Sequence, residues 1–170
     1  MTFRCSSKVR RKLGLRPRDL APAPLVPVGT DWHCNVVTLL RRPFFLFAHT
    51  QSLFAFVAPT AGASRPELFG TMFREQALWS LGEEGITLSA ARAIVDDSPD
   101  VFCKASDRRV IGTMVDHANM SRFVVEEEEA TSARVLIMVR KHINSSPMSI
   151  LAMDNPREAV KALLIDREAG

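Results

Sequence analysis

The stretch from Trp32 to Pro59 constrains the fold more than any other part of the chain, because it reads as consecutive β-strands. It begins with residues that alternate between two faces and continues with the apolar runs 44–47 and 53–57, which are rich in phenylalanine. Period-two alternation and aromatic enrichment favour strands over helix. The polar segments Arg41–Pro43 and His49–Ser52 are short enough for hairpin turns. We therefore expect an antiparallel meander over residues 32–59.

Length and composition fit one globular domain. The chain has 170 residues, of which 46% are hydrophobic and 24% are charged, and this supplies enough apolar material for an independent core. Strand runs that are apolar on both parities imply burial on both faces, or one face under helices. We predict that at least four of six phenylalanine rings are largely buried, namely Phe45, Phe47, Phe54, Phe56, Phe69 and Phe73.

The positive charge is concentrated at one end of the chain. Residues 1–20 contain seven Lys or Arg and one acid, Asp19, so they carry +6, whereas the whole chain carries +3. This segment reads as a short strand followed by a helix capped at Ser6 or Ser7, with these basic residues on the helix: Lys8, Arg10, Arg11 and Lys12. Such an end could contact nucleic acid or an acidic protein. The alternatives are a solvated helix face and an organellar transit peptide.

The sequence offers no support for several classes of protein. Three widely spaced cysteines without a CxxC motif indicate neither a disulfide framework nor a zinc site, and they favour a cytoplasmic location. No apolar run reaches the ~18 residues that a membrane span needs. The motifs HxH, HExxH, GxGxxG, GxxxxGK[ST] and GxSxG are absent, so we expect no metal and no cofactor. Cys34 follows His33 on a strand and points to the opposite face, which argues against a thiol enzyme.

The chain is expected to be mainly helical after the meander, from residue 64 to 165. A connector over residues 21–31, which holds three prolines and a glycine, precedes the meander. The best helix signal covers residues 64–81, where Ser64 and Glu67 have the spacing of a capping box.

The remaining elements have weaker signals. Ser89 is expected to cap a short helix that ends at Val95, and residues 100–105 are expected to form one more strand. Residues 131–143 fit a strand or a helix, because they contain a solid apolar run. A proline at an early position predicts a last helix over residues 155–165.

A helix over residues 107–121 carries the chemistry that stands out most. The spacing of its apolar residues predicts an inner face made of Val110, Ile111, Met114, Val115 and Ala118. Gly112 borders that face, so we predict that it allows close packing against the sheet. The polar face is then expected to carry Arg109, Asp116 and His117.

Two small constellations on this helix could form a site. Arg108 and Arg109 lie in its first turn, where positive charge opposes the helix dipole, and with the helix amides they could hold a phosphate or a carboxylate. The alternative is that Asp107 neutralises them. Asp116 could orient or charge the imidazole of His117, although no third group completes a triad at recognisable spacing.

The chain resembles a family of small uncharacterised bacterial proteins that is classed as a domain of unknown function. The resemblance rests on the start TFRCSSKVRRKLGL, on a W-x-x-N entry to the meander at Trp32–Asn35, and on SDRRVIGTMVDHA at residues 106–118, close to a family motif T-x-x-R-S-V-L-G-S-M-N-D. A Pro-x-Ser turn after Asn144 and a helix that starts with proline complete it. Arg109 replaces the usual Ser and Val115 the usual Asn. The resemblance implies a compact bacterial domain and no particular activity.

These observations favour a single α+β domain, with an antiparallel β-meander sheet of four or five strands that three or more α-helices cover mainly on one face. The favoured function is a non-enzymatic binding module, in which the basic N-terminal helix, together with Arg41 and Arg42, engages a nucleic acid or an acidic protein. The alternative is a small enzyme or anion-binding domain with a site around Arg108, Arg109, Asp116 and His117. The oligomeric state is left open by the sequence.

Overall fold

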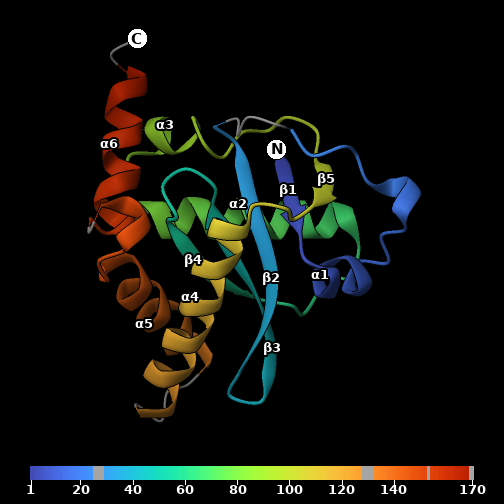
Figure 1. Ribbon diagram of the computed structural model, residues 1–170, viewed down its shortest axis with the longest axis horizontal. Coiled ribbons are helices and arrows are strands. Elements are labelled where there is room, and N and C mark those ends of the chain that lie inside the picture. The colour runs from blue at the N-terminus through green and yellow to red at the C-terminus, as the bar shows by residue number, and fades with distance from the viewer. Residues whose placement is uncertain (25–28, 128–131, 153, 169–170) are drawn as a thin grey trace.

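The computed structural model describes residues 1–170 apart from 25–28, 128–131, 153 and 169–170 (Figure 1). The strands are β1 (Thr2–Cys5), β2 (Asp31–Leu39), β3 (Arg42–His49), β4 (Ala55–Pro59) and β5 (Val101–Lys104). The α-helices are α1 (Ser7–Lys12), α2 (Pro66–Gly82), α3 (Leu88–Ala91), α4 (Arg108–Glu127), α5 (Ser132–Ser145) and α6 (Pro156–Glu168). Two short 3-10 helices, η1 (Pro17–Asp19) and η2 (Ser149–Leu151), lie in connections. The predicted α+β class is confirmed.

The five strands form one mixed sheet in the order β4-β3-β2-β1-β5. The predicted meander is confirmed, since β2 pairs with β3 and β3 pairs with β4, both antiparallel. The other half of the sheet is parallel, because β1 lies between β2 and β5 and runs in the direction of both. In this register Arg4 stands beside His33 on one side and Cys103 on the other.

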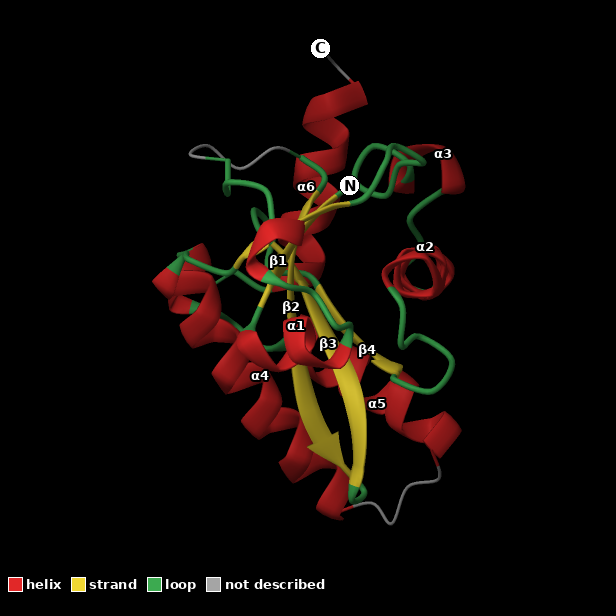
Figure 2. Cartoon of the chain, turned by 90° about the vertical axis from the view of Figure 1, so that its right-hand side faces the viewer, coloured by secondary structure: helices red, strands yellow, loops and turns green. Residues whose placement is uncertain are grey.

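Helices cover both faces of the sheet, so the expectation that they lie mainly on one face is wrong. Figure 2 shows α2 and α4 on opposite sides of the strands, with the sheet between them. One buried cluster joins the strands to α1, α2, α3 and α6, and the other joins them to α4 and α5. Strands that are apolar on both parities are explained by this two-sided cover.

The first cluster is aromatic. Phe3 and Phe69 lie with ring centroids 5.1 Å apart, and Phe47 and Phe73 lie 5.0 Å apart, both pairs in the tilted or edge-on geometry that aromatic rings favour. The predicted burial of the phenylalanines is confirmed for all six: Phe45, Phe47, Phe54, Phe56, Phe69 and Phe73 are at most 1% exposed.

The second cluster settles the ambiguity over residues 131–143. Residue 131 lies outside the described residues, and from Ser132 onward the segment is helical within α5, with Val135, Val139 and Ile143 recurring every fourth residue on its buried face. Asn144 then extends the edge of β4: its side-chain amide donates to the Ala55 carbonyl at 2.7 Å and accepts from the Ala55 amide at 2.8 Å. A helix residue thus completes the hydrogen bonding of an edge strand.

Two predicted helix caps are wrong in detail. At α2 the N-cap is Arg65, without a side-chain hydrogen bond, and no capping box forms between Ser64 and Glu67 in the part of the chain described. At α3 the N-cap is Thr87 instead of Ser89, and its hydroxyl accepts from the Ala90 amide at 3.2 Å. The cap at Ser6 of α1 is confirmed, with the Val9 amide donating to Ser6 Oγ.

The rotation of α4 also differs from the prediction. His117 is buried and Gly112 is exposed, and Ile111 and Val115 face outward. The helix runs six residues beyond the predicted end, and Ser121 and Val125 continue an inner face that Val110, Met114, His117 and Ala118 begin. The longer repeat determines which side packs on the sheet, so the predicted inner face is corrected at Ile111 and Val115.

Helix α4 is the longest in the described chain, at 20 residues. Among the helices that the structure describes, none is both long enough and apolar enough to cross a membrane.

Candidate ligand-binding site

A buried ion pair joins β1 to the start of β2. Arg4 donates from Nη2 to Asp31 Oδ2 at 2.7 Å and from Nε to the same oxygen at 3.1 Å. Both side chains are almost completely buried. The Arg4 guanidinium also donates to the Pro24 carbonyl at 3.0 Å, so it fixes this part of the connector against the sheet. A charge inside a sheet is stable only with such a partner.

His33 lies beside Arg4 on the same face of the sheet, completely buried. The pKa of His33 is lowered from 6.5 to about 4, chiefly by burial and also by the positive charge of Arg4, whereas the carboxylates of Asp107 and Asp31 act in the opposite direction. Neither ring nitrogen has a hydrogen-bond partner among the described residues. His33 is therefore a neutral imidazole with unused hydrogen-bonding capacity.

The N-terminus of α4 lies against this cluster. Asp107 Oδ1 accepts from the backbone amides of Arg109 at 2.9 Å and Val110 at 3.4 Å, and so caps the helix. Partial burial raises the pKa of Asp107, but these two amides and the positive charge of Arg109 together outweigh it, so the net pKa lies below the ordinary value. Arg109 Nη2 is 3.7 Å from Asp107 Oδ2, and 78% of the Arg109 side chain is exposed. The predicted neutralisation of Arg109 by Asp107 is thus present as a loose ion pair.

Two adjoining surface cavities open between the connector, the β3–β4 turn and the start of α4. They share three lining residues: Thr50, Asp107 and Arg109. The first cavity, about 330 Å³, is completed by Arg4, Ala23, Pro24 and Ser106. The second, about 260 Å³, is completed by Gln51, Leu53, Val110, Ile150 and Leu151. Arg4 lines only the first cavity, which we call the polar half, whereas Leu53, Val110, Ile150 and Leu151 line only the second, which we call the apolar half although Thr50, Gln51, Asp107 and Arg109 also line it.

Two further buried polar atoms at this site have no partner in the described structure. They are Thr50 Oγ1, on the wall shared by both cavities, and Asp31 Oδ1, behind the Arg4 guanidinium. Buried polar groups are satisfied in the great majority of cases, so each exception calls for an explanation. Together with His33, these make three residues at this site with buried polar atoms that lack a partner.

A larger surface cavity of about 590 Å³ lies elsewhere, between the start of α2 and the segment before β5. Its charged groups are already engaged, because Arg74 donates to Asp100 at 2.5 Å and to the carbonyls of Asp96 and Ser98. We therefore regard it as the surface of a structural ion pair.

Of the ten residues predicted for a site, only Arg109 lines these cavities. Arg108 and Asp116 lie exposed on the outer side of α4, while His117 is buried against the sheet. Burial lowers the pKa of His117 to about 4; the Leu53 backbone partly offsets this, although no hydrogen bond of standard geometry reaches either ring nitrogen. Asp116 therefore does not orient an accessible imidazole, and the proposed Asp116–His117 pair is wrong.

The other predicted residues lie on two separate surfaces. Arg41 is in the two-residue turn between β2 and β3, and Arg42 begins β3. The basic helix α1 begins next to Asn35, since Ser6 donates to Asn35 Oδ1 at 2.9 Å. Four strand residues, 36–39, lie between Asn35 and the turn, so the turn begins roughly 16 Å from Asn35 at ~3.3 Å per residue. The structure therefore does not bring Arg41 and Arg42 together with α1.

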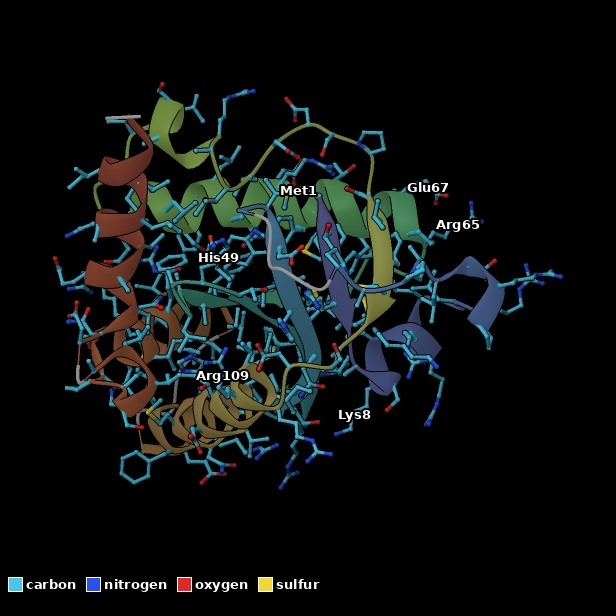
Figure 3. The ribbon with its side chains drawn as sticks, turned by 45° about the horizontal axis from the view of Figure 1, so that its top comes forward. Met1, Lys8, His49, Arg65, Glu67 and Arg109 are labelled. Atoms are coloured by element: carbon cyan, nitrogen blue, oxygen red, sulfur yellow. The ribbon has the colours of Figure 1, made fainter. Side chains whose placement is uncertain are left out.

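On α1 itself Lys8, Arg11 and Lys12 are exposed, and no acidic residue lies in that helix. Arg10 is half-buried. Figure 3 shows Lys8 and Arg109 at separate places on the molecule, one on α1 and the other at the start of α4. The basic helix and the cavities are two distinct candidate sites.

The sequence reasoning missed Arg4, Asp31, Thr50 and Asp107 as one constellation. The available signal was Arg4 itself, a charged residue in the middle of a short strand whose neighbours are apolar. Its partner Asp31 lies 27 residues away, and only the parallel pairing of β1 with β2 places them together. A search of the described residues for three or more clustered His, Cys, Asp or Glu side chains finds no group that could hold a metal ion.

The fold and the cavities define a small α+β domain with a polar pocket on one face of its sheet. The chain belongs to the family described as a domain of unknown function, DUF6933, whose family model matches residues 2–159. This agrees with the expected membership in an uncharacterised family. A comparison with curated proteins finds no match.

Proposed function

We propose that this chain is a bacterial, cytoplasmic ligand-binding domain that takes a small organic anion with an apolar body in the two adjoining cavities. The observation that carries this proposal is the shared wall of Thr50, Asp107 and Arg109, which has a space lined by Arg4 on one side and a space with four apolar side chains on the other. The free, buried cysteines Cys5, Cys34 and Cys103 support a reducing compartment.

The polar half suits a carboxylate or phosphate head. Arg109 holds Asp107 only loosely, so its guanidinium can turn toward a ligand without breaking a short hydrogen bond. Arg4 is held rigidly by Asp31 and Pro24 on the wall of the same space. Thr50 lines the same space, and next to it lies the buried Thr50 hydroxyl, which has no partner in the described part of the protein. Charge-assisted hydrogen bonds of this kind are about twice as strong as neutral ones.

The apolar half suits a short aliphatic or aromatic body. Leu53, Val110, Ile150 and Leu151 line it, and its volume of about 260 Å³ together with the neighbouring 330 Å³ falls in the range of small-molecule pockets. A ligand with one charged end and one apolar end matches both halves at once.

The test uses hexanoate, its uncharged analogue hexanamide and inorganic phosphate as probes, with binding followed by NMR titration of the ¹⁵N-labelled protein. We expect hexanoate to shift the amide signals of Thr50 and Val110 and to bind at least about tenfold more tightly than hexanamide, because a hydrogen bond to a charged group contributes roughly 1.5–3 kcal/mol. Phosphate should shift the signals of the polar half only.

Arg109→Gln should weaken hexanoate binding about tenfold or more. Arg108→Gln is the matched control, since Arg108 is the neighbouring arginine and does not line the cavities; it should bind hexanoate like the wild type. Equal loss in both variants, or shifts that avoid the cavity residues, would show that the cavities are not the binding site.

A second function, binding of nucleic acid or an acidic protein by α1, is favoured by a separate observation. Three exposed basic side chains, Lys8, Arg11 and Lys12, lie on a helix without an acid. Arg16, the N-cap of η1, and Arg18 within η1 follow, and both pair with Asp19. We propose this surface as a non-enzymatic contact for a polyanion, distinct from the cavities.

This second proposal is tested with a 20-nucleotide single-stranded DNA at several salt concentrations. Replacing Lys8, Arg11 and Lys12 with Ala should weaken binding and reduce the slope of log K against log salt by about two to three, because each phosphate contact contributes about 0.7–0.9. A variant with Arg41→Ala and Arg42→Ala, on the separate hairpin, should change binding much less. An unchanged slope in the triple variant would exclude α1 as the contact. The triple variant should bind hexanoate like the wild type, because its changes lie away from the cavities.

A further inference from the structure

The outer face of α4 carries an uncovered apolar stripe. Ile111 is 37% exposed, Val115 51% and Phe123 58%, all on the side of the helix that faces away from the sheet. Gly112 lies on the same side, where an added Cβ would meet no atom within 4 Å. Exposed apolar side chains that line up along one helix face mark an interaction surface more often than isolated ones do.

Charges along the same face alternate in sign. Arg108 lies at its start, followed by Asp116, Arg122 and then Glu126 near its end, and all four residues are exposed. Arg122 donates to Asn119 at 3.0 Å. Glu126 and Arg41 both line a small surface cavity near the end of α4, but in the described structure Glu126 forms no ion pair. The stripe therefore has a defined order of apolar and charged positions.

We propose that this face binds a second copy of the chain, with the two α4 helices packed antiparallel. The two-fold axis between them lies on the outer side of α4, at the level of residue 117 along the helix. Arg108 and Glu126 both lie nine residues from that point, and Ile111 and Phe123 both lie six residues from it. Arg108 of one copy then faces Glu126 of the second copy, and Ile111 lies level with Phe123 of the second copy. The two-fold symmetry makes each contact twice.

The remaining positions fit the same arrangement. Val115 and Asn119 lie two residues from the axis and face each other across the two copies. Arg122 comes opposite Gly112, one helical turn from Asp116 of the second copy, and the empty space at Gly112 accommodates the long side chain. A parallel pair would instead place Arg108 against Arg108 and Glu126 against Glu126, which repel. The charge order thus selects the antiparallel second copy.

The size of the surface sets the expected strength. A helix of 20 residues is about 30 Å long, so one helix from each copy forms an interface at the small end of specific contacts. We expect a reversible dimer with a dissociation constant on the order of 10 μM, rather than a permanent one.

Sedimentation equilibrium of the full chain between about 1 and 300 μM tests this proposal. The wild type should shift from monomer to dimer across that range. Phe123→Asp should raise the dissociation constant at least about tenfold, and Leu68→Asp, which changes a comparably exposed apolar residue on α2, should leave it unchanged. Thermal unfolding at 1 μM should show that both variants fold like the wild type, because both side chains are exposed.

The charge pairing is tested by exchange. Arg108→Glu and Glu126→Arg should each weaken the dimer, and the variant with both changes should recover most of the wild-type affinity, because every facing pair again has opposite signs. A monomeric wild type at 300 μM, a dimer that tolerates Phe123→Asp, or a double variant no stronger than the singles would each overturn the proposal. None of these changes touches the residues that line the ligand cavities.

Discussion

Arg4 Nη2 lies 2.7 Å from Asp31 Oδ2 across two neighbouring parallel strands, and both side chains are buried. This pair fixes more than two charges. Arg4 also holds the Pro24 carbonyl, and Asp31 accepts the Thr50 amide on its backbone carbonyl at 3.0 Å. The connector, the first two strands and the β3–β4 turn therefore meet at one ion pair, next to the cavities.

Removal of one partner should be severely destabilising. Asp31→Asn leaves the Arg4 charge buried without a counter-charge, and we expect a loss of about 3–5 kcal/mol in the free energy of unfolding, measured by urea titration at pH 7. Arg92→Ala, which removes an exposed ion pair with Asp97 at 3.1 Å, should cost less than about 1 kcal/mol. A similar small loss in both variants would show that the buried pair contributes little to stability.

The aromatic core gives a second comparison. Phe73 contacts Phe3, Trp32, Phe47 and Phe56, so Phe73→Ala should cost about 3–5 kcal/mol through lost contacts and a cavity. Leu68→Ala, on the same helix α2 but 49% exposed, should change stability by no more than about 0.5 kcal/mol. A loss below about 1 kcal/mol for Phe73→Ala would contradict the packing described for this core.

The meander and its buried phenylalanines could be predicted from the sequence, because the residue pattern that determines them lies within the segment itself. Alternation, phenylalanine content and short polar breaks between residues 32 and 59 determine strands whatever surrounds them. The cap at Ser6 is local in the same sense, since the hydroxyl and the amide that it accepts from are three residues apart.

The candidate site could not be predicted, because it depends on contacts between distant segments. Arg4 and Asp31 meet only through the parallel pairing of β1 with β2, and Thr50 and Asp107 come from two further segments. The rotation of α4 was predicted wrongly for a different reason. His117 has a polar side chain and was assigned to the polar face, but the sheet buries it, and the apolar Ile111 and Val115 face outward.

Two glycines inside helices, Gly70 and Gly112, should respond in opposite directions to substitution. A Cβ at Gly70 of α2 would overlap the Asp100 carboxylate, which Arg74 holds, so Gly70→Ala should destabilise the protein by roughly 1–3 kcal/mol. Gly112→Ala on α4 meets no neighbour and should stabilise by about 0.5–1 kcal/mol, because Ala favours the helix. Urea titration at 1 μM protein measures both effects, and a stabilised Gly70→Ala variant would rule out the close contact with Asp100.

The three cysteines should react only after unfolding. Cys5, Cys34 and Cys103 are buried and free. Burial raises the pKa of the Cys34 thiol well above its usual value, the neighbouring Cys5 adds to this, and burial raises the pKa of Cys103 to about 11. Because the thiolate is the reactive form, labelling with a disulfide reagent at pH 8 should be slow in buffer and rapid in 6 M guanidinium chloride. Rapid labelling of any thiol in buffer would show that it is accessible in the folded protein.

Two of the buried histidines, His33 and His117, should make the protein less stable in mild acid. Burial lowers the pKa of both His33 and His117 from 6.5 to about 4, so below pH 6.5 the unfolded chain binds protons that the folded chain does not. Stability from this source is complete above pH 6.5 and is lost as the pH falls toward 4, by at most roughly 3 kcal/mol for each histidine. In urea titrations at pH 7 and pH 4.5, His117→Leu should lose less stability between the two values than the wild type does. His142→Leu, which changes an exposed histidine, should keep the wild-type difference, and an equal pH dependence in all three proteins would show that His117 is not held neutral by burial.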